Sequence, residues 1–181
     1  MGHSRAKLTA YHEAGHAVMA WELRRSIRHV STIPDEEKGS LGHMLKGILG
    51  DVGEVEMAAR MGISQITRIR LKLEREAMIA LAGSAAVALL RNTRYSRAGA
   101  DRDWFQAEWL LSYLTGNGEE LPAYVDWLFK RTKSLLAMGY LWQAVEELAN
   151  ELMVRKYIGG RRARGIIKEA VRRLPSEMEG P

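Results

Sequence analysis

The fold is decided by residues 80–90, which read ALAGSAAVALL and carry no charged side chain. They end a longer stretch, residues 66–90, that contains no proline and is rich in residues with high helix propensity. A helical segment without charge on any face is typical of a helix that other elements bury on most sides. We therefore predict that residues 66–90 form a helix at the centre of the hydrophobic core.

The rest of the chain also favours helices, because apolar residues recur at helical spacing between glycines, prolines and polar turns. Predicted helices cover residues 5–25, 101–114, 122–138 and 141–157, and a last, basic helix lies between Gly160 and Pro175. The β-branched residues 27–33 are expected to pair with residues 41–45 in a short hairpin, and residues 46–62 to form a loop that leads into a short helix. The expected fold class is mainly α, with one small β-hairpin or sheet.

Composition limits the chemistry that the chain can carry. With 181 residues, of which 46% are hydrophobic and 27% charged, the chain suits one compact domain without an internal linker. Cysteine is absent, so disulfides, thiolate metal sites and cysteine nucleophiles are excluded, and a metal must be held by His, Asp or Glu. The net charge of +5 is spread along the chain and points only weakly to nucleic acid.

Hydropathy bears on the expected location. The longest apolar stretch, residues 78–90, is thirteen residues long, whereas a membrane-spanning helix needs about 20. The N-terminus has no signal-peptide core, and Met1 to Ser4 are interpreted as a cloning remnant. A cytoplasmic location is therefore expected, with membrane association only if the chain belongs to, or works with, a membrane-anchored protein.

One motif carries the predicted chemistry: residues 12–16 read His12-Glu13-Ala14-Gly15-His16, an H-E-x-x-H sequence. On a helix, two histidines four residues apart lie on nearly the same face, about 6 Å apart along the axis, so both imidazoles can reach one ion. Glu13 is rotated by about 100° from His12, which leaves its carboxylate available to accept a proton from water. The motif predicts a zinc site with Glu13 as the general base.

A catalytic zinc also needs a third protein ligand and an open position for water. His29 and His43 are expected to face the surface or a substrate rather than the metal. The remaining candidates are the downstream carboxylates of Glu74, Glu76, Asp101, Asp103 and Glu108. Spacing alone does not choose among them.

Several segments together resemble a known family. Residues 9–18 read TAYHEAGHAV, residues 29–34 read HVSTIP and residues 40–42 read SLG. Further along, LAGSAA at residues 81–86 is similar to an L-x-G-R-A-A helix, and GADRDW at residues 99–104 is similar to G-A-x-N-D-L. In this order, and over essentially the whole chain, they resemble the protease domain of the FtsH family of ATP-dependent zinc metalloproteases.

The resemblance implies a compact, helical, zincin-like peptidase domain that acts as a zinc-dependent endopeptidase. It places Asp103, 87 residues after His16, at the position of the family's third zinc ligand, with Asp101 as the nearest rival. His12, His16 and Asp103 would then hold Zn²⁺, and Glu13 would activate the water that attacks the peptide bond.

The chain also departs from the family pattern. Val87 and Ala88 stand where the family has acidic residues, and Arg102 replaces an asparagine beside the ligand. The phosphate-binding pattern G-x-x-x-x-G-K-[ST] does not occur, so ATP-independent activity is expected. The expected substrate is an unfolded or flexible polypeptide, and the expected partners are further copies of the chain in a homo-oligomer or a separate unfoldase.

Substrate is expected to bind along Val30, Ser31, Thr32 and Ile33, the best sheet edge close to the metal helix in sequence. Backbone pairing at such an edge would hold an extended peptide without demanding a particular sequence. The alternative is a strand that is fully paired within its hairpin and serves only packing.

Two other functions compete with the peptidase. Residues 58–67 have the Ala, Gly and Ser spacing of a helix-turn-helix unit, and Arg68, Arg70 and Lys72 follow, so the 58–72 segment is a candidate DNA-binding module. Helix-turn-helix spacing is not specific to DNA-binding proteins, so nucleic acid is not the expected partner on this signal alone. The other alternative is a catalytically silent FtsH-like scaffold or interaction domain, and the complete set of predicted ligands and base argues against it.

Overall fold

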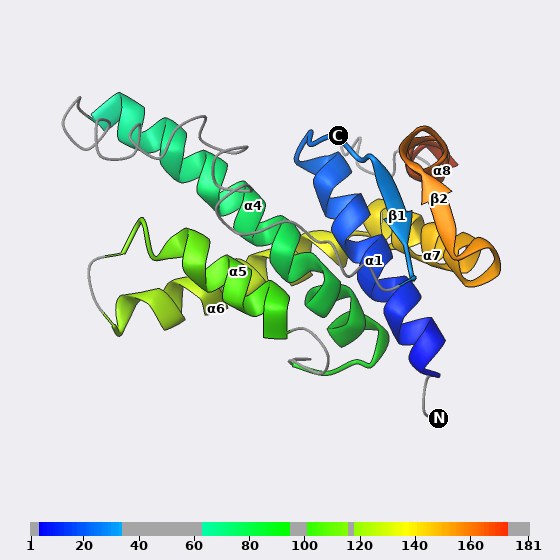
Figure 1. The fold of residues 1–181 in the computed structure, drawn as a ribbon, viewed down its shortest axis with the longest axis horizontal. Helices are drawn as coiled ribbons and strands as arrows, with labels where there is room; N and C mark the ends of the chain where they lie inside the picture. Colours follow the sequence, from blue (N-terminus) through cyan, green and yellow to red (C-terminus); the bar gives the residue numbers. More distant parts are fainter. Residues whose placement is uncertain (1–3, 34–62, 95–100, 116–117, 174–181) are drawn as a thin grey trace, which may run out of the picture.

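The computed structural model describes residues 4–33, 63–94, 101–115 and 118–173, and of residues 63–66 and 101 it describes the backbone alone. Within these ranges the chain is mainly helical and has a small antiparallel sheet of two strands (Figure 1), which confirms the expected fold class at this level. In chain order the elements are α1 (Arg5–Glu22), β1 (His29–Ser31), α4 (Ile63–Leu90), α5 (Asp101–Leu111), α6 (Glu120–Leu136), α7 (Gly139–Arg155), β2 (Tyr157–Gly159) and α8 (Gly160–Arg173).

Helix α4 lies at the centre, as its uncharged sequence predicts. α1 crosses it on one side, α5 and α6 pack along another, α7 packs against α1, and α8 packs on α7 (Figure 1). Residues 80–88 of α4 are all buried, including Ser84. Removing this apolar surface from water is the main favourable contribution to folding, which explains why the segment without charges occupies the centre.

The ends of α1 and α7 show which local signals set helix boundaries. The side-chain oxygen of Ser4 accepts a hydrogen bond from the backbone N–H of Lys7 at 3.3 Å, so Ser4 takes part in the fold as the N-cap of α1. α1 ends at Glu22, before the predicted end at residue 25, and Arg24 beyond it has a left-handed φ of 58°. Lys156, with φ of 60°, ends α7 in the same way, before the predicted end at residue 157.

The sheet differs from the predicted hairpin. β1 falls within the predicted strand, but it pairs antiparallel with β2 from the far end of the chain, in the register His29–Gly159, Val30–Ile158 and Ser31–Tyr157. The expected partner, residues 41–45, lies outside the described residues, as does the loop at 46–62. The sequence predicts a helix end and a turn where β2 lies, and that prediction is wrong. A three-residue strand between two helices has almost no local signal and depends on its long-range partner.

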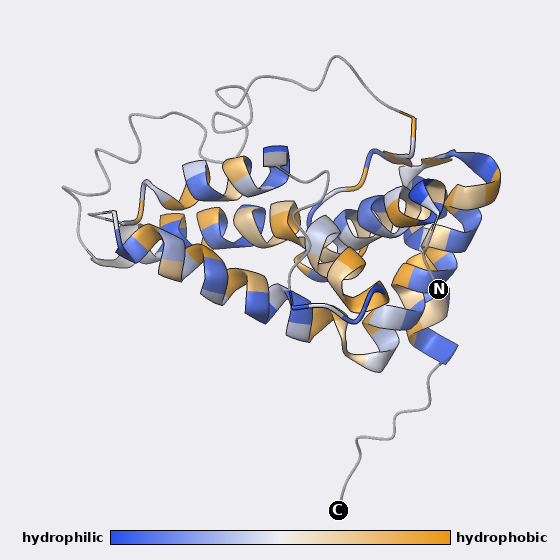
Figure 2. Cartoon of the chain, turned by 90° about the horizontal axis from the view of Figure 1, so that it is seen from below, coloured by the Kyte–Doolittle hydropathy of each residue, from blue (hydrophilic) through white to orange (hydrophobic). Residues whose placement is uncertain are grey.

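Hydrophobic and hydrophilic residues are distributed over different faces of the helices (Figure 2). The pattern is clearest in α8, where Ala163, Ile167 and Ala170 are buried while Arg161 and Lys168 are exposed. Such a distribution is typical of helices that cover a core with one face and meet water with the other. In the part of the chain that the structure describes, no helix is both long and apolar enough to cross a membrane.

Candidate metal centre

The candidate site lies where α1 crosses α4, and two glycines make this crossing close. A Cβ atom on Gly15 of α1 would lie 2.5 Å from the backbone oxygen of Ala82 in α4. A Cβ atom on Gly83 of α4 would lie 2.5 Å from Nε2 of His16 and 2.6 Å from Nε2 of His12. These distances are far below ordinary van der Waals contact. Glycine at both positions therefore lets the two helices approach and leaves room for the imidazoles.

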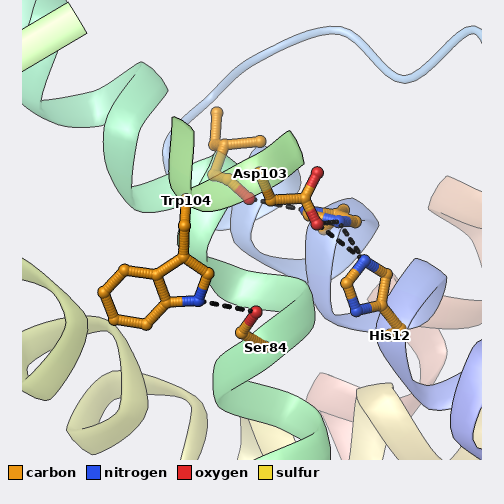
Figure 3. Close-up of polar contacts among 6 residues, drawn as sticks. His12, Ser84, Asp103 and Trp104 are labelled. Atoms are coloured by element: carbon orange, nitrogen blue, oxygen red, sulfur yellow. Dashed lines mark hydrogen bonds and ion pairs between the residues drawn. The ribbon is translucent and has the colours of Figure 1, made fainter. Parts of the chain in front are cut away.

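Three side chains from two helices meet beside this crossing (Figure 3). Nε2 of His12 lies 2.8 Å from Oδ2 of Asp103, which α5 supplies, and Nε2 of His16 lies 3.3 Å from the same oxygen. The two Nε2 atoms are 3.0 Å apart. Among the described residues, this is the one group of three His, Asp or Glu side chains whose donor atoms all lie within 4.8 Å of one another. The structure therefore brings together the three predicted ligands.

The orientation of His16 is set from α4. Its Nδ1 lies 2.7 Å from the backbone oxygen of Ile79. A carbonyl oxygen can only accept a hydrogen bond, so Nδ1 must donate, and in the neutral imidazole Nε2 then keeps a free lone pair. A hydrogen bond to the remote ring nitrogen fixes the ligating nitrogen of metal-bound histidines in the same way. Ile79 thus directs Nε2 of His16 toward Asp103 and His12.

The close approach of these side chains shifts the pKa values of His16 and Asp103. Burial lowers the pKa of His16, but the hydrogen bond and charge of Asp103, the charge of Glu13 and the bond to Ile79 together raise it above its ordinary value. Burial raises the pKa of Asp103, but hydrogen bonds and charges of His12 and His16 lower it by more, so this carboxyl ionises well below its usual range. The site therefore keeps an anionic carboxylate and favours a positive charge next to it.

The donor set fits a zinc ion. Ligands about 2.0–2.2 Å from a tetrahedral ion stand roughly 3.3 Å from one another, and the three distances here run from 2.8 to 3.3 Å. Two imidazole nitrogens and one carboxylate oxygen are ligands that zinc accepts, and three protein ligands leave a fourth position for water. The three side chains are about one-fifth exposed, 18% to 22%, so solvent can reach them.

Glu13 lies beside the converging donors rather than among them. It follows His12 on α1, its side chain is partly buried, and its charge is close enough to raise the pKa of His16. It does not belong to the described group of converging ligand atoms. A general base needs a carboxylate that is near the metal ligands but not occupied as one, and the role of Glu13 as that base stays a prediction.

Of the two remaining histidine candidates, His29 is not part of the group, and His43 lies outside the described residues. His29 is exposed on β1, and its ring stacks on that of Tyr157 with a centroid distance of 5.4 Å. Glu108 is on α5 with Asp103 but is not part of the converging set. The side chain of Asp101 lies outside the described part, so the choice of Asp103 over Asp101 stays a prediction.

The other two carboxylate candidates, both on α4, are occupied by other partners. Glu74 accepts hydrogen bonds from Tyr124 and from Nε of Arg70, the latter at 2.9 Å. Glu76 pairs with Nε of Arg25 at 2.5 Å. Neither residue belongs to the converging group, so neither supplies the third donor in this arrangement.

The segment with helix-turn-helix spacing is described only in part. Residues 58–62 lie outside the described ranges, and the rest forms the first turns of α4, which continues without a break to Leu90. Of the three basic residues that follow the pattern, Arg70 is paired with Glu74 and lies over the ring of Tyr124, 5.6 Å from its centroid. One of the cations proposed for DNA is thus committed to contacts within the protein.

Strand β1, the predicted substrate edge, uses one of its edges to bind β2. The backbone N–H of Thr32 donates to the backbone oxygen of Lys156 at 2.9 Å, and Val30 is paired with β2 and buried. Because hydrogen bonding alternates along an antiparallel pair, the backbone groups of Ser31 point to the opposite edge. Ile33 is 56% exposed at the end of this segment. Of the predicted set, Ser31 therefore has backbone groups directed away from β2, and Thr32 has its N–H committed to the sheet.

Sequence reasoning missed the residues that hold the ligands in place. Ile79 orients His16 through its backbone oxygen, an atom that every residue has, so the sequence contains no signal for it. Ser84 accepts a hydrogen bond from Nε1 of Trp104 at 3.2 Å (Figure 3). This pair has a weak signal, because a lone hydroxyl in an otherwise apolar, buried helix requires a polar partner.

A comparison with models of known protein families finds none that matches the chain, and a comparison with curated proteins finds no significant match. These comparisons therefore assign no family. The resemblance to FtsH-family peptidases rests on the quoted motifs, and the function argued below rests on those motifs together with the geometry of the site.

Proposed function

We propose that this chain is a zinc-dependent endopeptidase of the zincin type, similar to FtsH-family peptidases, which hydrolyses unfolded or flexible polypeptides without an ATPase activity of its own. The proposal rests on one observation: Nε2 of His12, Nε2 of His16 and Oδ2 of Asp103 lie within 3.3 Å of one another, beside Glu13. Two donors belong to one H-E-x-x-H motif and the third comes from a different helix. Three donors aimed at one point are the arrangement that a catalytic metal needs.

The proposed roles follow from the chemistry of each group. His12, His16 and Asp103 would hold the ion, which when bound supplies a Lewis acid that polarises a carbonyl group and makes water acidic near neutral pH. Glu13 accepts the proton of the attacking water on its carboxylate and delivers it to the departing amine. Ile79 keeps His16 in the tautomer whose Nε2 lone pair faces the site.

The proposed substrate is an extended segment of polypeptide that lies along the edge of β1 opposite β2. Ser31 directs its backbone groups to that edge, and α1, which carries the H-E-x-x-H motif, packs against β1 (Figure 1). Antiparallel pairing would hold the backbone of the substrate and place few demands on its side chains. Stably folded proteins rarely expose such a segment, which is why unfolded or flexible chains are the proposed substrates.

The decisive experiment separates metal binding from hydrolysis. We expect the purified chain to bind about one zinc ion and to cleave casein, with no stimulation by ATP. Glu13→Gln should keep the zinc and lose hydrolysis, whereas His16→Ala and Asp103→Ala should lose the zinc as well. Zinc content is measured by metal analysis after dialysis, and hydrolysis by release of labelled peptides.

Two matched variants serve as controls. Glu22→Gln makes the same change on the same helix as Glu13→Gln, and Glu108→Ala removes a carboxylate from α5 outside the converging group. Both should keep zinc and activity. A parent chain that binds zinc but cleaves no polypeptide would support the catalytically silent scaffold instead. An Asp103→Ala variant that binds zinc as tightly as the parent would contradict the proposed third ligand and favour Asp101.

The substrate edge has its own test in Ser31→Pro. Proline removes the N–H that points away from β2, while the bond from Thr32 to Lys156 stays. We expect KM for peptide cleavage to rise by about 3- to 10-fold, the size of one lost hydrogen bond, at unchanged zinc content. Ser31→Ala is the control, since it removes the side-chain oxygen, which accepts from the N–H of Ile33, and keeps the backbone N–H. Cleavage by Ser31→Pro at the kcat/KM of Ser31→Ala would place the substrate elsewhere.

A further inference from the structure

In the part of the chain that the structure describes, the polar partners of the Asp103 carboxylate are the two histidines of α1. Nε2 of His12 and Nε2 of His16, the two side chains that would share the metal with it, lie 2.8 and 3.3 Å from its Oδ2. A carboxylate that ligates a metal is usually held by a further hydrogen bond, which fixes its direction. The helix that carries Asp103 is therefore the candidate element for fixing its position.

The residue that follows Asp103 anchors this helix. Trp104 is 4% exposed, and its indole Nε1–H donates to Oγ of Ser84 in α4 at 3.2 Å (Figure 3). Its ring also packs on that of Phe129 in α6, with the centroids 5.1 Å apart. Trp104 thus contacts two other helices, and it is adjacent in sequence to the third donor of the metal centre.

Ser84 ties this anchor directly to the crossing of α1 and α4. It is 1% exposed and follows Gly83, the glycine whose missing side chain leaves room for both imidazoles. Two successive residues of α4 therefore act on the site from different directions: Gly83 faces the histidines of α1, and Ser84 faces the helix that carries Asp103. A rotation of α5 that moved Asp103 away from the histidines would also break the bond between Trp104 and Ser84.

We propose that the buried hydrogen bond between Trp104 and Ser84 is a positioning device for the metal centre, which holds the first turn of α5 so that Asp103 reaches His12 and His16. Trp104 and Ser84 are positioning residues, because they would act on the metal centre through the placement of Asp103. In the L-x-G-R-A-A and G-A-x-N-D-L patterns that the chain resembles, the two positions hold Arg and Leu, which cannot form this bond. The inference rests on the proposed function, because it assumes that Asp103 ligates a metal.

A double-mutant cycle on zinc affinity tests the inference. Trp104→Phe keeps an aromatic ring against Phe129 and removes the N–H, while Ser84→Ala removes the acceptor and adds no bulk. Each single variant should bind zinc about 3- to 10-fold more weakly than the parent, and the double variant no more weakly than either single one. Zinc affinity is measured by competition with a chromogenic chelator, so the readout does not depend on hydrolysis.

A purely structural role is distinguished by a control and a second measurement. Trp109→Phe makes the same change on α5, at a residue that packs on Tyr113, and should leave zinc affinity within twofold of the parent. Urea unfolding of the metal-free proteins reports any general loss of stability. If Trp104→Phe does not fold, Ser84→Ala alone carries the test, because it leaves the indole in place.

The outcomes separate this inference from the function on which it rests. A parent chain that binds no zinc would overturn both. A parent that binds zinc, with Trp104→Phe and Ser84→Ala within twofold of it, would overturn the positioning role alone, even if both variants unfold more easily. Additive losses in the double variant would also overturn it, because two residues that act through one hydrogen bond cannot lose that bond twice.

Discussion

The crossing of α1 with α4 and the packing of α7 against α8 are built from different kinds of residue. At the first, glycine and alanine face one another, as at Gly15 and Ala82, and polar ligands lie beside the contact. Helices α7 and α8 instead bury large apolar side chains, of which Leu148 and Leu152 of α7 and Ile167 of α8 have no exposed surface.

The difference separates two tasks within one core. Small residues bury little apolar area, so the first crossing contributes less hydrophobic stabilisation for each residue than the second. It provides instead a short distance between helices and a space for two imidazoles. We therefore expect changes at the first region to act mainly on metal binding, and changes at the second to act mainly on the free energy of unfolding.

The largest effect is expected for Gly83→Ala. Its new Cβ would lie 2.5 Å from Nε2 of His16, and the ring ends are the atoms that must move. The ligand atoms are then displaced while the fold survives, so zinc affinity should fall by about 10- to 100-fold. Gly165→Ala on α8 is the matched control, because nothing lies within 4 Å of its added Cβ. Zinc affinity near that of the control would show that the crossing tolerates a methyl group.

The second region should respond in the opposite way to Leu148→Ala. Leu148 has no exposed surface, so its truncation leaves a cavity and should lower the free energy of unfolding by about 2–5 kcal/mol. Urea denaturation of the metal-free protein measures this loss. At temperatures where the variant is folded, its zinc affinity should stay within twofold of the parent. A loss of zinc affinity comparable to that of Gly83→Ala would mean that the two regions are not separate.

The smallest effect is expected at the edge of the first region, where Glu76 of α4 pairs with Arg25. Burial raises the pKa of Glu76, and the charge and hydrogen bond of Arg25 lower it by less, so it lies above the usual 4.5. The folded protein thus binds the proton more tightly than the unfolded chain. The resulting stability is full below pH 4.5 and is lost as the pH rises through the raised pKa.

Glu76→Gln should remove this pH dependence. The amide has no charge to desolvate, and Arg25 remains half exposed to water, so the variant should match or exceed the parent at pH 7 by less than about 1 kcal/mol. Its relative advantage should shrink as the pH approaches 4.5. Urea unfolding at both pH values provides the measurement, and a variant clearly less stable than the parent at pH 7 would show that the ion pair stabilises the fold.

Much of the site could be predicted because its signals are local. The spacing of His12 and His16 follows from the geometry of one helix, and the resemblance pointed to Asp103, which the structure places beside them. The predicted zinc and catalytic roles remain predictions. Ile79 and the partnership of Ser84 with Trp104 could not be predicted, since they join residues that are distant in sequence and depend on how α1, α4 and α5 pack.

By itself, the sequence determined where the helices form and which of them lies at the centre, because helix propensity and the lack of charge in residues 80–90 act within each segment. Only the tertiary structure decided that β1 pairs with β2 and that Thr32 gives its N–H to Lys156. It also decided how three donors meet at one point. Strand pairing and donor convergence depend on contacts between segments far apart in the chain, and their energies exist only once those segments are packed together.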